Sequence, residues 1–98
     1  MPAINVNGFR TGSRYMPDRR DLNRAFPGNT RGSNTSLIAG IVFETIRQHC
    51  DALIDLHTGS FERANLPQVR VDLANPRALE LARRFGAAVV MGGAGPKG

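Results

Sequence analysis

Residues 34–59 read NTSLIAGIVFETIRQHCDALIDLHTG, and this stretch decides the class of fold. Its first part repeats apolar residues at helical spacing, and Ser33 or Asn34 is placed to cap the helix. Residues 52–56 then form a short apolar run that is typical of a strand buried on both faces. We therefore expect a helix followed by a buried strand, with His57 at the carboxyl end of that strand.

Further elements are expected on both sides of this stretch. Residues 2–7 alternate apolar and polar side chains and predict a short strand, as do residues 68–73. Residues 75–86 begin with Asn-Pro and end with Gly, which predicts a helix, and residues 87–91 predict a third, apolar strand. This order predicts an α/β fold with a partial, mixed or parallel sheet and flanking helices. In such sheets ligands lie beyond the carboxyl ends of strands, which is where His57 is expected.

The length and composition predict one small domain. The chain has 98 residues, of which 41% are hydrophobic and 21% charged, an ordinary balance for a globular protein. We assign residues 1–91 to the domain and residues 92–98 to a flexible tail. The sequence shows neither an apolar run long enough to cross a membrane nor a secretory leader, and it contains one cysteine. These features predict a cytoplasmic chain with no membrane partner.

The net charge of +5 leaves two classes of partner open. A basic chain could bind nucleic acid, but the basic residues are scattered and the chain has only 5 Phe, 1 Tyr and no Trp for stacking on bases. An excess of arginine suits an enzyme with acidic substrates equally well, because a guanidinium matches a carboxylate in a two-pronged geometry. These residues therefore argue against nucleic acid as the partner and leave a small carboxylate-bearing substrate open.

A long polar segment, residues 8–32, precedes the first helix. It is rich in Gly, Pro and Arg, and a loop of this length in a small domain is usually functional or disordered. Within it Asp21 can cap one helical turn that Pro27-Gly28 stops. Five arginines in this segment are either solvated charges or site residues: Arg14, Arg19, Arg20, Arg24 and Arg31.

His57 is the first candidate for a metal ligand, since neutral imidazole binds zinc readily. The other histidine, His49, is better interpreted as a residue at the C-terminal end of the helix. Cys50 is expected to be a small buried apolar residue. Asp55 is expected to be a hydrogen-bonded polar residue near a strand end, and it could orient a site residue.

Three segments together resemble the succinylglutamate desuccinylase/aspartoacylase family, which is related to the zinc carboxypeptidases. They are Asn5-Val6-Asn7-Gly8-Phe9, then Arg14-Tyr15 through Asp21-Leu22-Asn23-Arg24-Ala25-Phe26-Pro27-Gly28, then Ile54-Asp55-Leu56-His57-Thr58-Gly59. The similarity runs from about residue 2 to residue 91. The resemblance implies a zinc-dependent hydrolase that cleaves an amide bond of an N-acyl amino acid or a similar carboxylate-bearing substrate, within a zinc carboxypeptidase-like fold.

The resemblance also implies roles for particular residues. His57 is similar to the family's third zinc ligand, and Asn23 and Arg24 to the pair that holds a substrate carboxylate. Arg14 is similar to the arginine that polarises the scissile carbonyl and stabilises the oxyanion. Zinc and a guanidinium would then share the developing negative charge.

Part of the family pattern has no counterpart in this sequence. The first two zinc ligands of the family come from a His-x-x-Glu motif upstream of the first matching segment, and its general-base glutamate lies beyond residue 91. We therefore expect an internal fragment that is inactive alone. A genuinely short, non-catalytic carboxylate-binding module is the alternative, and a basic nucleic-acid-binding domain comes third. Open sheet edges would favour pairing with another chain, as in a homo-oligomer.

Overall fold

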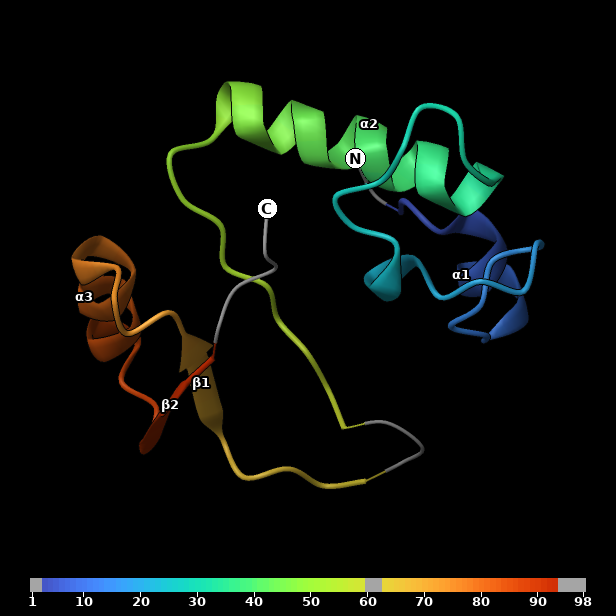
Figure 1. Cartoon of the computed structure of the whole chain (residues 1–98). Coiled ribbons are helices and arrows are strands. Elements are labelled where there is room, and N and C mark those ends of the chain that lie inside the picture. The colour runs from blue at the N-terminus through green and yellow to red at the C-terminus, as the bar shows by residue number, and fades with distance from the viewer. Residues whose placement is uncertain (1–2, 60–62, 94–98) are drawn as a thin grey trace. The chain divides into compact units, whose positions relative to one another are not determined.

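A computed structural model describes residues 3–59 and 63–93 (Figure 1). The chain divides into two compact units, Met1–Leu53 and Ile54–Gly98, and each is described by itself. Within the described residues, no helix combines the length and the apolar character needed to cross a membrane. The elements, in chain order, are α1 (Val6–Thr11), the 3-10 helix η1 (Leu22–Arg24), α2 (Asn34–His49), β1 (Gln68–Val71), α3 (Pro76–Phe85) and β2 (Val89–Gly92).

Helix α2 is the longest element and confirms the prediction for this part of the sequence (Figure 1). Its N-cap is Ser33, whose hydroxyl accepts a hydrogen bond from the Ser36 amide at 3.3 Å. The side of α2 that faces the rest of the first unit buries Thr35, Ala39 and Val42. The core of this unit is therefore small and lies along one face of α2.

The strand predicted at residues 2–7 is wrong for its described part, because helix α1 begins at Val6. The Asn5 side chain accepts a hydrogen bond from the Gly8 amide at 2.7 Å and so caps the helix. Gly12 ends it with a left-handed conformation, φ 65°. A short run of alternating apolar and polar residues can form a strand or a helix. Here the capping residues Asn5 and Gly12 favour the helix. Residue 2 lies outside the described residues.

The long segment between α1 and α2 is ordered by local turns and by contacts with α2. Asp21 caps η1 as predicted, since its carboxylate accepts a hydrogen bond from the Asn23 amide at 3.0 Å. Farther along, the backbone at Gly28 lies against Gly40 of α2. A Cβ atom on Gly28 would come within 2.2 Å of the Gly40 nitrogen, and its φ of +89° also favours glycine. Η1 contacts α2 as well, so the loop packs along the helix.

The second unit contains a β-α-β arrangement. Strands β1 and β2 pair in parallel, with Gln68 opposite Val89 and Val71 opposite Gly92. Helix α3 connects the strands and contacts β1, and Asn75 caps it by accepting a hydrogen bond from the Ala78 amide at 3.1 Å. The predicted strands at 68–73 and 87–91 and the helix between them are confirmed, with β2 ending at Gly92. The α/β class is therefore confirmed, with a two-stranded parallel sheet.

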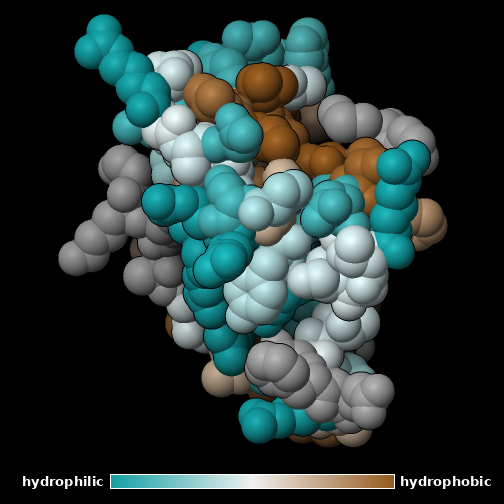
Figure 2. All heavy atoms as spheres, turned by 90° about the vertical axis from the view of Figure 1, so that its right-hand side faces the viewer, coloured by the Kyte–Doolittle hydropathy of each residue, from teal (hydrophilic) through white to brown (hydrophobic). Residues whose placement is uncertain are grey.

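The strand predicted at residues 52–56 is absent from the structure, where this segment is neither helix nor strand. Leu53, Ile54 and Leu56 are 64%, 53% and 78% exposed. A strand buried on both faces needs neighbours to pair with and layers to cover it, and the described sheet joins only β1 and β2. Figure 2 shows that hydrophobic residues also reach the surface elsewhere, beside hydrophilic ones.

Candidate functional site

Asp21, in the first unit, contacts three of the four predicted site residues: Arg14, Asn23 and Arg24. Its Oδ2 atom lies 2.5 Å from Nη2 of Arg14 in an ion pair. Its Oδ1 atom accepts a hydrogen bond from the backbone amide of Asn23, and its carbonyl oxygen accepts one from the amide of Arg24, both at 3.0 Å. Asp21 therefore contacts the Arg14 side chain and the Asn23 amide through its carboxylate, and the Arg24 amide through its backbone carbonyl.

Arg24 also lines an open pocket of about 280 Å³ between η1 and the start of α2. Within the part of the chain that the structure describes, the Arg24 guanidinium makes no hydrogen bond or ion pair. Asn23 is exposed but is not one of the pocket residues. The lining residues are Arg20, Asp21, Arg24, Ala25, Ser33 and Ser36.

The electrostatics of this pocket favour an anion. Two arginines, Arg20 and Arg24, line it, and the charge of Asp21 is already paired with Arg14. Two serines, Ser33 and Ser36, line it as well. Guanidinium groups bind carboxylates with paired, charge-assisted hydrogen bonds, so the pocket is suited to a carboxylate.

Asp18 holds the loop that carries these arginines onto α2. Its Oδ1 atom accepts a hydrogen bond from the Thr35 hydroxyl at 2.5 Å, and its Oδ2 atom accepts one from the Thr35 amide at 3.1 Å. The hydrogen bond from the Thr35 hydroxyl is the main reason why the pKa of Asp18 lies below its ordinary value of 3.8; partial burial acts in the opposite direction. The amides of Thr35 and Arg20 and the charge of Arg20 lower it further.

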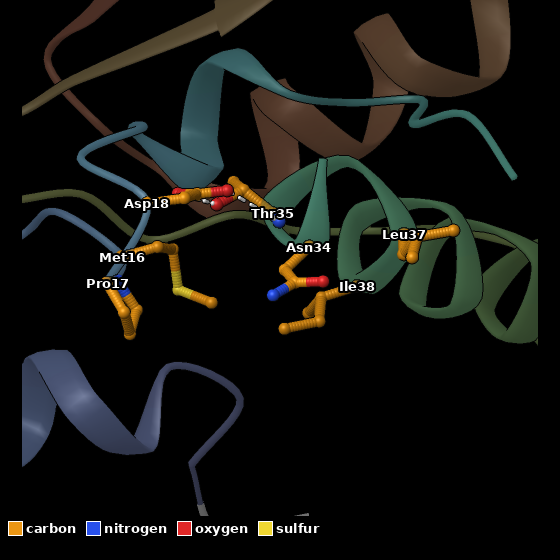
Figure 3. Close-up of a pocket in the computed structure, with 7 residues that line it drawn as sticks. All are labelled: Met16, Pro17, Asp18, Asn34, Thr35, Leu37 and Ile38. Carbon is orange, nitrogen blue, oxygen red and sulfur yellow. Dashed lines mark hydrogen bonds between the residues drawn. The ribbon is translucent and has the colours of Figure 1, made fainter. Parts of the chain in front are cut away.

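A second pocket, of about 330 Å³, is lined by both residues of this contact. Figure 3 shows the Asp18–Thr35 hydrogen bonds at its edge and mainly apolar side chains around it. Neither the Asp18–Thr35 pair nor this pocket was predicted from the sequence, because residues far apart in the chain form both. The lining residues are Met16, Pro17, Asp18, Asn34, Thr35, Leu37 and Ile38.

His57 belongs to the second unit, whereas Arg14, Asn23 and Arg24 belong to the first. Its Nε2 atom lies 2.7 Å from Oδ2 of Asp55, and the two side chains are 60% and 65% exposed. With the Asp55 carboxylate as the acceptor, Nε2 is the donor, and in the neutral imidazole Nδ1 then carries the lone pair. The expected hydrogen bond of Asp55 is therefore present, although the expected strand is not.

The described residues contain no group of three or more His, Cys, Asp or Glu side chains that could hold a metal ion. His57 and Asp55 form a pair instead, and a catalytic zinc usually takes three protein ligands. Cys50 is exposed, which corrects the prediction that it is buried. It directly follows the last residue of α2, outside the face of the helix that packs.

The comparisons with known proteins agree with the motif. Residues 1–98 match the succinylglutamate desuccinylase/aspartoacylase catalytic domain family. The chain is 33% identical over 93 residues to an N-alpha-acetyl-L-2,4-diaminobutyric acid deacetylase of Halomonas elongata, and the match covers 89% of this chain. It spans 27% of the length of that relative. No solved structure is significantly similar to this chain. Since the family match extends over every residue, the chain belongs to the succinylglutamate desuccinylase/aspartoacylase catalytic domain family.

Proposed function

We propose that this chain forms the carboxylate-binding part of a deacylase, a hydrolase that cleaves the amide bond of an N-acyl amino acid or a similar carboxylate-bearing substrate. The observation that carries the proposal is the pocket in which Arg24 presents a guanidinium without a hydrogen bond or ion pair to any described residue. Membership of the family and the deacetylase name of the relative support the type of reaction. The location we expect is the cytoplasm, on the ground of the single cysteine.

In this proposal the arginines have different tasks. Arg24 binds the substrate carboxylate in a two-pronged geometry, and the exposed Asn23 side chain, next to it in η1, adds a hydrogen bond. Arg14 stabilises the negative charge that develops on the scissile carbonyl oxygen. Its ion pair with Asp21 fixes the direction of the guanidinium before the substrate arrives.

We further propose that His57 supplies one ligand of a catalytic zinc. Nδ1 is the ring nitrogen left to bind a metal, since Nε2 is hydrogen-bonded to Asp55. The described residues fit one ligand and not a complete site, so the proposal requires further ligands from a longer protein with a zinc carboxypeptidase-like fold. When bound, zinc would supply Lewis acidity and an activated water.

The direct test is a hydrolysis assay on N-acetyl amino acids. The chain alone should release no acetate, whereas the longer protein that we propose should release it in a zinc-dependent manner. In the longer protein, Arg24→Gln should chiefly raise KM, and His57→Ala should abolish both metal content and activity. Arg31→Gln is a matched control, because Arg31 lies in the same loop but does not line the pocket.

Two results would contradict the proposal. If His57→Ala kept full metal content and activity, the zinc assignment would be wrong. If the longer protein bound carboxylates without hydrolysing any of them, the chain would be a non-catalytic binding module instead.

A further inference from the structure

We propose that Asp21 is a positioning residue with two separable tasks in the reaction. One carboxylate oxygen directs Arg14 toward the scissile carbonyl, and the other holds η1, which carries the residues that bind the substrate carboxylate. This proposal rests on the roles of Arg14 and Arg24 assigned above and adds the residue that connects them. Asp21 acts through these neighbours and needs no contact with the substrate.

The contacts of Asp21 are divided between its two carboxylate oxygens. Oδ2 lies 2.5 Å from Nη2 of Arg14. Oδ1 accepts a hydrogen bond from the Asn23 amide at 3.0 Å and so caps η1. The carbonyl oxygen of Asp21 also accepts a hydrogen bond from the Arg24 amide at 3.0 Å. One residue therefore joins the arginine of the reaction step to the short helix of the binding step.

Burial and backbone pairing give Asp21 a more fixed position than Arg14. The side chain of Asp21 is 16% exposed, whereas that of Arg14 is 40% exposed. The backbone of Asp21 also forms an isolated antiparallel bridge with Tyr15, the residue that follows Arg14. A partly buried charge is screened less by salt than an exposed one. The carboxylate is therefore the fixed partner of the pair, and it directs the guanidinium.

The two tasks depend on different properties of the carboxylate. The charge-assisted contact with Arg14 needs its negative charge. The cap of η1 needs only an oxygen that accepts a hydrogen bond, and Asn caps helices about as well as Asp does. Asp21→Asn should therefore keep η1 in place while it removes the ion pair with Arg14. Asp21→Ala removes both contacts.

Two NMR measurements on this chain test the division without any assay of activity. At low temperature the two Nη groups of Arg14 should give separate signals, because the ion pair restricts rotation of the guanidinium. These signals should merge in Asp21→Asn. Hydrogen exchange of the Asn23 amide reports on the cap, and it should stay within about twofold of wild type in Asp21→Asn but become faster in Asp21→Ala. Separate Arg14 signals in Asp21→Asn, or equally fast exchange in both variants, would overturn the proposal.

Kinetics of N-acetyl amino acid hydrolysis by the longer protein test the consequence for the reaction. Asp21→Asn should lower kcat about tenfold and leave KM within about twofold of wild type, because substrate binding is kept and only the direction of Arg14 is lost. Asp21→Ala should lower kcat to a similar extent and also raise KM about fivefold, since the cap is lost as well. In an Arg14→Gln background, Asp21→Asn should have no further effect on kcat.

Glu44→Gln is the matched control, because it breaks the ion pair with Arg47 in the same unit without touching the pocket, and it should change neither kcat nor KM. An unchanged kcat in Asp21→Asn, or an effect that adds to that of Arg14→Gln, would show that Asp21 does not position Arg14. If Arg14→Gln itself leaves kcat unchanged, the proposed role of Arg14 is wrong as well. Circular dichroism establishes that each variant is folded. Asp21→Ser, which also caps without a charge, takes the place of Asp21→Asn if that variant is not folded.

Discussion

The carboxylate of Asp18 accepts two hydrogen bonds from Thr35, one from its hydroxyl at 2.5 Å and one from its backbone amide at 3.1 Å. Thr35 is completely buried at the start of α2. The contact joins residues 17 positions apart and holds the arginine-bearing loop against the helix. It therefore positions the walls of both pockets in the first unit.

Loss of this contact should destabilise the first unit. Asp18→Ala removes the acceptor of both hydrogen bonds, and Thr35→Val removes the hydroxyl while it keeps the side-chain volume. Both variants should lower the melting temperature in thermal unfolding followed by circular dichroism, and Asp18→Ala should have the larger effect. The double variant should be no worse than Asp18→Ala alone, because the two residues act through one contact. Additive losses would show that they act independently.

The Asp18–Thr35 contact should also make stability depend on pH. The pKa of Asp18 is lower in the folded protein than its ordinary value of 3.8, chiefly because of the Thr35 hydroxyl. The unfolded chain therefore takes up a proton first as the pH falls. The stabilisation is complete above the ordinary pKa and is lost as the pH falls through the folded pKa.

Urea unfolding of the wild type and Asp18→Asn, from about pH 6 down to about pH 3, measures this effect. The difference in unfolding free energy should be largest at the upper end of this range and should shrink below about pH 4. Glu44, whose pKa is lowered mainly by its hydrogen bond to Arg47, contributes equally in both proteins and so cancels. A difference that stays constant over the range would contradict the assignment.

The close approach of Gly28 to α2 predicts that an alanine substitution destabilises the protein more at Gly28 than at Gly12. Gly28→Ala places a methyl group within 2.2 Å of the backbone of Gly40 and adds the cost of a positive φ. Gly12 has a positive φ as well, +65°, but a Cβ there meets nothing within 4 Å. In chemical denaturation, Gly12→Ala should lower the free energy of unfolding by about 1 kcal/mol. Gly28→Ala should lower it distinctly more. Equal losses would mean that the loop does not pack against α2 as described.

The Asp55–His57 pair predicts an effect on metal binding. Asp55→Asn should weaken zinc binding by the longer protein about tenfold to hundredfold, because Asp55 orients the imidazole through Nε2. His57→Ala should remove the bound zinc altogether, as measured by metal analysis after dialysis. Asp51→Asn is a suitable control, since Asp51 is an exposed acidic residue in the same connecting segment. Unchanged zinc affinity in Asp55→Asn would show that the pair has no part in metal binding.

The features that the sequence predicted correctly are local. Ser33, Asp21 and Asn75 each cap the helix that follows them by a hydrogen bond to an amide two or three residues later. Such contacts depend on a few neighbouring residues and leave a readable signal. The contacts of Asp21 with Arg14 and with the Asn23 amide also lie within one short stretch, but the sequence analysis predicted only the capping role of Asp21.

The features that the sequence did not predict depend on partners elsewhere. The apolar run at 52–56 has the composition of a buried strand, but strand formation requires neighbours that the described sheet does not provide. Asp18 and Thr35 contact each other across a loop, and no local sequence pattern predicts that these two residues pair. The sequence does not distinguish Arg20 from a solvated arginine, whereas the structure shows that Arg20 and Arg24 line the same pocket.

Arg24 is the residue that we propose binds the carboxylate of the substrate. The affinity of the chain for N-acetylalanine and for N-acetylalaninamide, in which an amide replaces the carboxylate, tests this role. The wild-type chain should bind the acid at least about tenfold more tightly than the amide, and Arg24→Gln should abolish this difference. Equal binding of the two compounds by the wild type, or an undiminished preference for the acid in Arg24→Gln, would contradict the claim.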